Sequence, residues 1–368
     1  MRNGKRRRVV ALLLLIIMLM LVLASGLLTG CGSAKAPGPR EALQGIDRFF
    51  HEKGNLKPTE DLTAASWYRP GDSITDWIMI MEERAGFSVD RERYLEDLAA
   101  YVTDCYGTDR RLDRAKATEW HRIALAVLYS GGDPTYFGQD ASRQPVDLIA
   151  DGIFYWQQTA ELDTQGSNAF MYALNVLRAG GYTSPADAVY AEEDMIAALL
   201  AYQGEDGGFS LSSRGSEVDL TAMALQALAR YRENGKSYEV NGKNVTVAGA
   251  CEQAVDYLAA QERQGGYYAF GAGYSSDSCA QVIMALCALG IDPEKDERFI
   301  KAGAGPVDAL LSFRNADGGF AVTLGEGGKP EYSDLLSSRE AGCALTALLM
   351  LRENGNGDYY APDNGLKK

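Results

Sequence analysis

Helical periodicity runs through residues 40–353, and two kinds of helical segment alternate along it. Six segments are rich in Ala, Leu and Met and are apolar on nearly every side: Ile74–Ala85, Lys116–Tyr129, Ser167–Ala179, Asp219–Arg232, Ser278–Leu289 and Arg339–Arg352. The six that alternate with them carry more charge: Arg40–Glu52, Arg91–Cys105, Pro145–Gln158, Ala186–Gln203, Ala248–Gln261 and Asp296–Arg314. Helices that are apolar all round are buried, and helices with one apolar stripe cover them. The alternation therefore predicts an all-α fold of six inner and six outer helices, an (α/α)6 toroid.

A glycine-rich motif marks the repeat unit. Gln-x-x-x-Gly-Gly-aromatic occupies residues 203–209 and 261–267, and a third copy at 314–320 begins with Arg314 in place of Gln. The glycine pairs begin at 207, 265 and 318, which gives spacings of 58 and 53 residues. A long period indicates stacked units that cannot bury their apolar faces alone. We expect each glycine pair to end an outer helix in the left-handed conformation.

The motif resembles the repeat of the squalene-cyclase and prenyltransferase superfamily over about residues 70–353. The resemblance includes residues 116–120, 131–134 and 165–170, and it is strongest to the secreted bacterial prenyltransferase/squalene-oxidase-repeat proteins. It implies a toroid of the terpenoid cyclase and protein prenyltransferase type. Terpene cyclases and the cobalamin carriers related to transcobalamin share that fold. Because fold does not imply function, the resemblance leaves the activity open.

Residues 217–222 invite an enzymatic interpretation, because they resemble the Asp-x-Asp-Asp-Thr-Ala motif of class II terpene cyclases. The resemblance makes Asp219 the acid that protonates an alkene, with Glu217 in place of the first Asp and Leu220 in place of the third. The alternative is a capping box, in which Ser216 caps the helix and Asp219 bonds back to it. The same spacing recurs at Ser73 with Asp76 and at Ser337 with Glu340. Three copies favour a structural cap over a unique catalytic acid.

Parallel inner helices would bring their first turns together around one mouth of the toroid. That mouth would gather Asp76, Trp77, Glu119, Trp120, Gln165, Asn168, Glu217, Asp219, Asp277 and Glu340. A concave site of carboxylates, amides and indoles suits a cationic or polyhydroxyl ligand better than a phosphate, which disfavours prenyl diphosphate. Aromatic residues at positions 267, 268, 270 and 274 either line such a site or pack their own loop, and packing is the favoured interpretation.

The N-terminus resembles a lipoprotein leader. Basic residues at positions 2 and 5–8 precede the apolar run Val9–Leu28, which ends in the lipobox-like sequence Leu28-Thr29-Gly30-Cys31. This predicts a signal peptide over 1–30, cleavage before Cys31 and a lipid on its thiol. An uncleaved membrane anchor is the alternative, and both place the rest on the extracytoplasmic side of the cell membrane. The predicted organisation continues with a tether and first outer helix at 31–65, the toroid at 66–353 and a C-terminal tail at 354–368.

Composition narrows the choice of partners. The formal net charge is −14, and removal of the leader with its five basic residues would make it −19. Such an acidic chain disfavours nucleic acid as a partner. Five cysteines beyond Cys31 lie in apolar helical segments, so we expect buried thiols and not a disulfide framework. The two histidines and the cysteines show no metal-ligand spacing, and the sequence predicts neither a metal nor a cofactor.

The leading hypothesis is a lipid-anchored binding module whose ligand is a small molecule, cobalamin-like or isoprenoid, or a cell-surface polymer. The alternatives are a terpene cyclase/mutase-like isomerase with Asp219 as general acid, and a scaffold for protein contacts. The surroundings of Asp219 discriminate between them. A cyclase needs this carboxyl at the bottom of a closed aromatic cavity, whereas a binding module has it exposed where a helix starts.

Overall fold

The computed structural model describes residues 38–108, 111–156, 161–212, 215–362 and 364–366. One compact unit runs from Gly38 to Lys368, and it includes both the first outer helix and the C-terminal segment. The predicted leader and Cys31 lie outside the described residues. Within the described residues, no helix has the length and apolar character needed to cross a bilayer.

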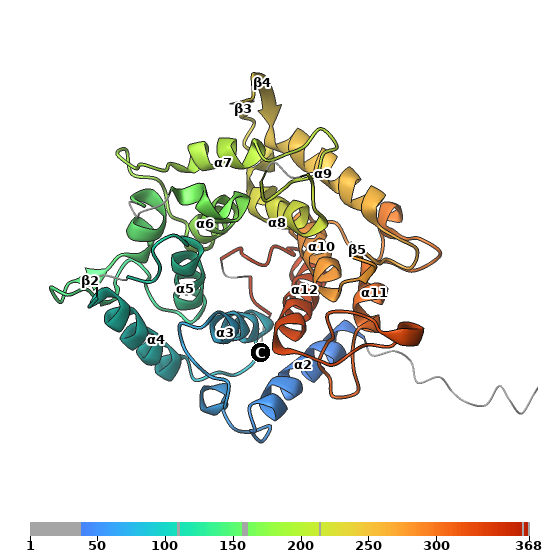
Figure 1. Ribbon diagram of the computed structural model, residues 1–368, viewed down its shortest axis with the longest axis horizontal. Coiled ribbons are helices and arrows are strands. Elements are labelled where there is room, and N and C mark those ends of the chain that lie inside the picture. The colour runs from blue at the N-terminus through green and yellow to red at the C-terminus, as the bar shows by residue number, and fades with distance from the viewer. Residues whose placement is uncertain (1–37, 109–110, 157–160, 213–214, 363, 367–368) are drawn as a thin grey trace, which may run out of the picture. The chain divides into compact units, whose positions relative to one another are not determined.

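Six helices form a closed inner ring, as predicted (Figure 1). Each contacts the next in chain order, and the last contacts the first. They are α3 (Ser73–Ala85), α5 (Thr118–Tyr129), α6 (Ser167–Gly180), α8 (Val218–Leu228), α10 (Ser276–Ala288) and α12 (Leu335–Asn354). Buried Ala, Leu, Ile and Met side chains cover these helices on most sides. The all-α toroid predicted from the apolar pattern is therefore confirmed.

The outer layer is less regular than predicted. It consists of α2 (Pro39–Lys53), α4 (Arg91–Tyr106), the π-helical η2 (Ala150–Phe154), α7 (Glu192–Leu200), α9 (Val247–Gln261) and α11 (Pro306–Ser312). The helix predicted over 145–158 was wrong in extent, because Pro145 pairs in a strand and the Asp147 side chain accepts hydrogen bonds from Ile149 N and Ala150 N. The one predicted over 296–314 is broken, since Gly305 and Pro306 restart it.

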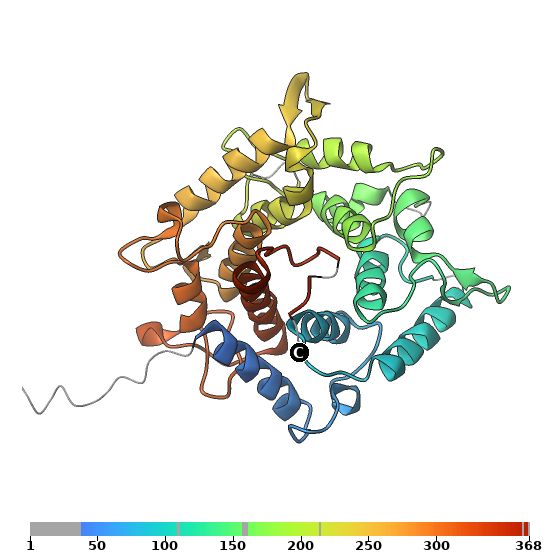
Figure 2. The same cartoon turned by 180° about the vertical axis from the view of Figure 1, so that it is seen from behind.

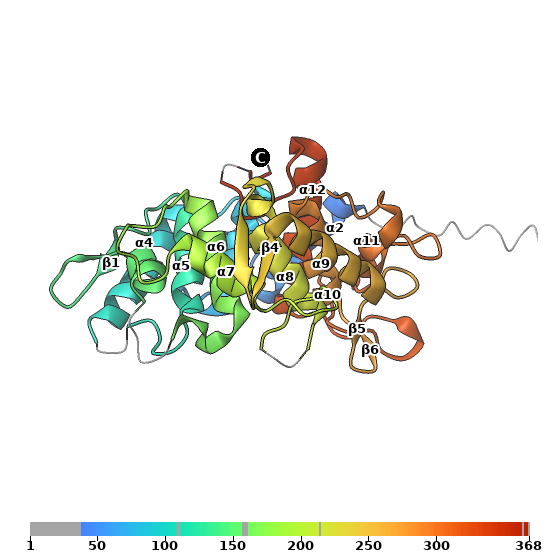
Figure 3. The same cartoon turned by 90° about the horizontal axis from the view of Figure 1, so that it is seen from above.

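Short elements connect the two layers. Three antiparallel hairpins pair β1 (Phe137–Gln139) with β2 (Pro145–Val146), β3 (Ser237–Val240) with β4 (Lys243–Thr246), and β5 (Ala269–Phe270) with β6 (Gly273–Tyr274). The 3-10 helices are η1 (Leu62–Ala64), η3 (Leu162–Gln165), η4 (Ala229–Glu233), η5 (Glu297–Phe299) and η6 (Glu326–Gly328). Seen from the side, the β5–β6 hairpin lies at one end of the rings and the C-terminal end of α12 at the other (Figure 3).

The glycine pairs do not cap the outer helices, which corrects the prediction. Helix α7 ends at Leu200, and Gly207 and Gly208 lie in the loop beyond it. Gly207 has φ +86°, and a Cβ there would lie 2.6 Å from Gln253 O in α9. Gly208 has no positive φ, but a Cβ would lie 2.5 Å from Ser216 Cβ. The pair is small because this loop packs directly on the next outer helix.

The other motif residues complete this junction. Gln203 Nε2 donates to Gly207 O and to Ala250 O, both at 2.8 Å, so it ties the loop to α9. Phe209 is fully buried, and its backbone N donates to the Thr221 hydroxyl of inner helix α8. The motif therefore joins an outer helix, the following inner helix and the next outer helix, which supports the prediction that it marks the fold.

The described residues 356–362 and 364–366 of the C-terminal segment enter the centre of the inner ring from one end (Figures 1 and 2). Tyr359 and Tyr360 are buried, and Tyr129 Oη donates to Tyr360 O at 3.2 Å. Arg84 Nη2 donates to Ala361 O at 3.0 Å. This segment, the C-terminal plug, was predicted only as a tail.

An ion pair fixes the plug to inner helix α6. Arg178 pairs with Asp358, whose side chain is 1% exposed. Asp358 Oδ1 also accepts from Tyr360 N at 3.0 Å, which holds the turn of the plug. The plug reaches α12 as well, where Cys343 lies 3.3 Å from Tyr359 Oη. Cys343 is buried, as are Cys251, Cys279 and Cys287.

Candidate functional site

The first turns of all six inner helices lie on one face, which we call the N-terminal face. Contacts near the helix starts support this: Thr118 bonds Gln165, Trp77 packs on Tyr172, and Gln281 bonds Glu340. Ser167 at the start of α6 bonds Ser210 in the loop before α8, and Ser278 in α10 bonds Asp219 in α8. The loops that lead into the inner helices border this face. The plug enters the ring from the opposite end, so an external ligand meets the ring at the N-terminal face.

An acidic pocket lies on this face where α8 begins. It has a volume of about 300 Å³, and its lining includes Glu217, Asp219, Tyr257, Phe270 and Ser278. Glu217 is exposed, whereas Asp219 is half-buried. Phe270, in the β5–β6 hairpin, is 57% exposed. The pocket therefore opens to solvent beside Glu217 and Phe270 and is not a closed cavity.

The capping boxes predicted from Ser-x-x-acid spacing were wrong. At α8 the N-cap is Glu217, and Ser216 Oγ instead donates to Asp206 Oδ1 at 2.6 Å. At α3 the cap is Asp72, whose side chain accepts a hydrogen bond from Ile74 N. At α12 the cap is Asp334, whose side chain accepts one from Ser337 N. At α3 the adjacent Asp72 and Ser73 compete for the cap position, and a carboxylate is favoured there by the helix dipole.

Asp219 is a weak acid in this setting. Burial raises its pKa, a hydrogen bond from Ser278 opposes that rise, and the nearby carboxyls of Asp277 and Glu217 add to it. Its Oδ1 is buried and has no hydrogen-bond partner among the described residues. Protonation of an alkene requires a stronger acid than an ordinary carboxyl, and these surroundings act in the opposite sense. These surroundings favour a role in which the Asp219 carboxyl accepts a hydrogen bond from a ligand.

A second acidic group joins α10 and α12. Burial raises the pKa of Asp277 to about 6, the Glu340 carboxylate adds to this, and the Ser337 and Ser276 hydroxyls lower it. Glu340 accepts from Gln281 Nε2 at 2.9 Å and pairs with Arg339 Nη1 at 2.6 Å. The Arg339 guanidinium is therefore neutralised, and the face as a whole stays acidic around α8 and α10.

The opposite side of the face is aromatic. Trp77 and Tyr172 pack with ring centroids 5.7 Å apart, and the Arg339 guanidinium lies 5.5 Å from the centroid of Trp77. Trp77, Tyr172, Glu119 and Asn168 line a small hollow of about 120 Å³. The Asn168 Oδ1 atom is buried there without a hydrogen-bond partner among the described residues.

Two predicted mouth residues point elsewhere. Asp76 is fully buried and bonds Arg122 Nε at 3.0 Å and Tyr94 Oη at 2.8 Å. Trp120 is fully buried toward the outer layer, where its Nε1 donates to Tyr106 Oη at 2.6 Å. Both side chains hold the inner ring to the outer one, so neither is placed to contact a ligand.

The predicted residues that the structure does gather on this face are Trp77, Glu119, Gln165, Asn168, Glu217, Asp219, Asp277 and Glu340. Sequence reasoning missed Tyr172, Gln281 and Arg339. Polar and charged residues inside apolar inner helices were the available signal, because such side chains need a partner or a polar opening. Among the described residues, no group of three or more His, Cys, Asp or Glu side chains could hold a metal ion.

The aromatic residues of the loop before α10 partly pack against one another and partly remain exposed beside the pocket. Tyr268 is fully buried, and Tyr267 stacks on Tyr274 with centroids 4.7 Å apart. Phe270 and Tyr274 remain 57% and 37% exposed. Of the eight large apolar side chains exposed in the described part of the chain, six lie at or just before the start of an inner helix: Ile74, Leu211, Phe270, Tyr274, Tyr332 and Leu336.

Fold and site together define an α/α toroid that is plugged at one end and has an acidic, partly aromatic face at the other. No protein-family profile matches the chain, and no curated protein matches it in sequence. Among solved structures it is similar to ent-copalyl diphosphate synthase from Streptomyces platensis, with a TM-score of 0.45 and 15% identity over 74% of this chain. It is also similar to haptocorrin in complex with Cbi, with a TM-score of 0.44 and 12% identity over 83% of this chain.

This chain covers half of the first solved structure and 65% of the second. At these values the ligands and activities of those proteins do not extend to this chain. Its function has to be inferred from its own residues.

Proposed function

We propose that this protein is a ligand-binding module that takes a cationic ligand at the N-terminal face. The observation that carries the proposal is the asymmetry of the ring. One end is closed by the C-terminal plug, whereas the other has a pocket lined by the Glu217 and Asp219 carboxylates, with no cationic side chain among its described lining residues. Six exposed apolar side chains lie in or before the first turns of inner helices, and such exposure is typical of interaction sites.

The chemistry of the pocket supports a cation over an anion or a neutral hydrocarbon. No Lys, Arg or His side chain lines it in the described residues, and Tyr257 and Phe270 offer aromatic faces that attract positive charge. A polyamine or a basic polymer end meets these requirements. A terpene cyclase is disfavoured, because Asp219 lies in an open pocket and its pKa is raised.

Spermine is a suitable probe for the full chain, with calorimetry as the readout. We expect binding that weakens as salt rises, because the attraction is largely electrostatic. The double variant Glu217→Gln/Asp219→Asn should weaken it about tenfold, or about 1.4 kcal/mol. The control Glu239→Gln/Glu252→Gln removes two exposed carboxylates from the outer layer and should leave affinity within about twofold. Equal losses in both double variants would show that net charge, and not this pocket, holds the probe.

The proposal includes a lipid anchor on Cys31, which rests on the lipobox-like sequence of residues 28–31. Such an anchor places the N-terminal face outside the cytoplasm, where cell-surface polymers and imported small molecules are encountered. Cys31→Ala should release the chain from membranes or stop its processing, as measured by fractionation and mass spectrometry. Unchanged retention with unchanged mass would favour a membrane-spanning anchor.

A further inference from the structure

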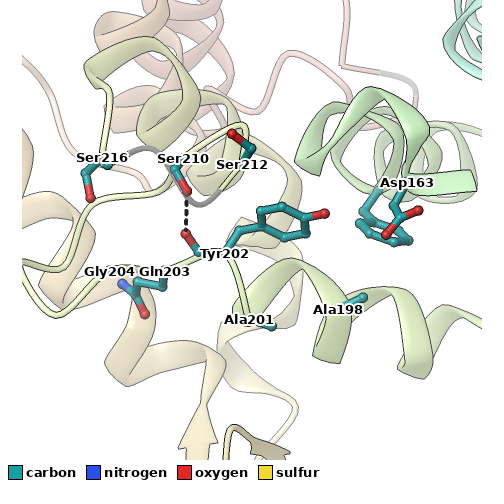
Figure 4. A pocket seen from close by; sticks show the side chains of 11 residues that line it. Asp163, Ala198, Ala201, Tyr202, Gln203, Gly204, Ser210, Ser212 and Ser216 are labelled. Carbon is teal, nitrogen blue, oxygen red and sulfur yellow. Dashed lines mark hydrogen bonds between the residues drawn. The ribbon is translucent and has the colours of Figure 1, made fainter.

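A separate pocket lies on the outer layer beside the N-terminal face, between η3, α7 and the loop that follows α7 (Figure 4). Its volume is about 590 Å³, within the range of small-molecule sites. The acidic pocket and this one share Ser216. Nothing in the proposed cation site uses its other residues.

The two walls of this pocket differ in chemistry. Phe170 and Tyr202 form an aromatic wall, with ring centroids 6.4 Å apart. The Tyr202 ring is half-buried and points toward Asp163 (Figure 4). Its hydroxyl makes no hydrogen bond to a described residue, although Asp163 is close enough to raise its pKa, after burial as the larger cause.

The polar wall is held in place by the chain itself. Ser216 Oγ donates to Asp206 at 2.6 Å, and the Ser210 hydroxyl lies 3.4 Å from Tyr202 O. Gln203 is fixed by two hydrogen bonds from its Nε2. These bonds tie Gln203, Ser210 and Ser216 to their neighbours, while the Ser212 and Asp163 side chains are exposed.

The repeat motif does not require an aromatic residue at the position of Tyr202. The residue before the motif is Tyr202 in the first copy, but it is an exposed Ala260 in the second and a fully buried Phe313 in the third. A half-exposed ring at this position is therefore a feature of one repeat, and the fold itself does not require it. It is the kind of departure from a structural pattern that marks a binding site.

We propose that this pocket binds a neutral carbohydrate. One face of a sugar ring is apolar and stacks on Tyr202, while its hydroxyls bond Asp163, Ser212 and the free Tyr202 hydroxyl. The charged side chain among the described lining residues is the Asp163 carboxylate, which repels phosphate and carboxylate ligands.

The test is binding of chitotetraose, cellotetraose and maltotetraose to the full chain, measured by calorimetry at millimolar glycan. We expect at least one to bind, and Tyr202→Ala to weaken that glycan about tenfold through loss of stacking. Tyr202→Phe keeps the ring and should lose only about threefold, through loss of one hydroxyl. Asp163→Asn, at an exposed position, tests the polar wall without risk to folding.

Tyr136→Ala is the matched control, because Tyr136 is 71% exposed in the described structure and lies outside this pocket. It should bind the glycan as the wild type does. Binding of none of the three glycans, or equal binding by wild type and Tyr202→Ala, would overturn the proposal. Loss of spermine binding but not glycan binding in Tyr202→Ala would also overturn it, since the pocket would then belong to the cation site.

Discussion

The C-terminal plug offers the sharpest test of how this toroid is held together. Asp358→Asn keeps the shape of the side chain and the acceptor for Tyr360 N, but it removes the charge that pairs with Arg178. Asp358 is 1% and Arg178 is 13% exposed, so the remaining guanidinium would stay buried without its partner.

Removal of one partner from a buried ion pair costs about 3–5 kcal/mol. We expect the free energy of unfolding to fall by that amount, measured by urea denaturation followed by far-UV circular dichroism. In a unit of this length the melting temperature should fall by roughly 4–7 °C. The double variant Arg178→Met/Asp358→Asn removes the unpaired charge as well, so it should recover part of the loss.

The pair Arg40 and Glu353 provides a matched control, because it also joins distant parts of the chain but is exposed, at 51% and 43%. Glu353→Gln should cost no more than about 1 kcal/mol. If Asp358→Asn were as mild as Glu353→Gln, the plug would be a loosely held tail. The N-terminal face would then not be the single open end of the ring, and the reasoning behind the proposed function would fail.

Three further predictions concern the motif and the acidic face. Gly208→Val should lower the free energy of unfolding by about 1–3 kcal/mol, because its side chain would overlap Ser216 and Tyr257, whereas Gly38→Val, with no atom within 4 Å, should change the urea midpoint little. Because the pKa of Asp277 is raised from 3.8 to about 6, the folded chain holds that proton more tightly and wild-type stability should fall as pH rises through this window. Asp277→Asn should flatten this dependence of stability on pH, which amounts to a change of up to about 3 kcal/mol in the free energy of unfolding. If the variant keeps the wild-type dependence, groups other than Asp277 cause it. Neither the wild type nor Asp219→Asn should cyclise squalene, and wild-type turnover that this variant abolishes would restore the cyclase hypothesis.

The inner ring was predictable because helices that are apolar on every side must be buried, and the alternating helices with one apolar stripe can cover them. Because these helices are apolar on all sides, the sequence pattern does not show which of their side chains face the mouth of the ring. Trp120 and Trp77 look alike in sequence, yet one packs toward the outer layer and the other toward the ring's centre. Periodicity cannot separate two buried faces of one helix, so the candidate site was predicted as a set of first turns and only part of that set was right.

The plug was missed for a different reason. Residues 356–366 have no helical or strand period, and their contacts are with residues far away in sequence, such as Arg84 and Arg178. The buried Tyr359 and Tyr360 were the signal, since adjacent aromatic residues are unusual in a solvated tail. The helix caps were predicted wrongly because residue spacing alone does not decide which of two neighbouring polar residues, such as Asp72 and Ser73, caps the helix.

The polarity of the inner helices explains why the two ends of the ring differ. Six parallel helices place their positive dipole ends on one face, where Asp219 and Asp277 lie in first turns; the dipoles favour acidic residues there, although burial raises the pKa of both. Their negative ends meet at the opposite face, where Arg84 and Arg178 lie in the last turns of α3 and α6. Those arginines bind the carbonyl of Ala361 and the carboxylate of Asp358, so the plug is attracted to that end. Helix polarity therefore favours the arginines that hold the plug at one face and acidic side chains at the other.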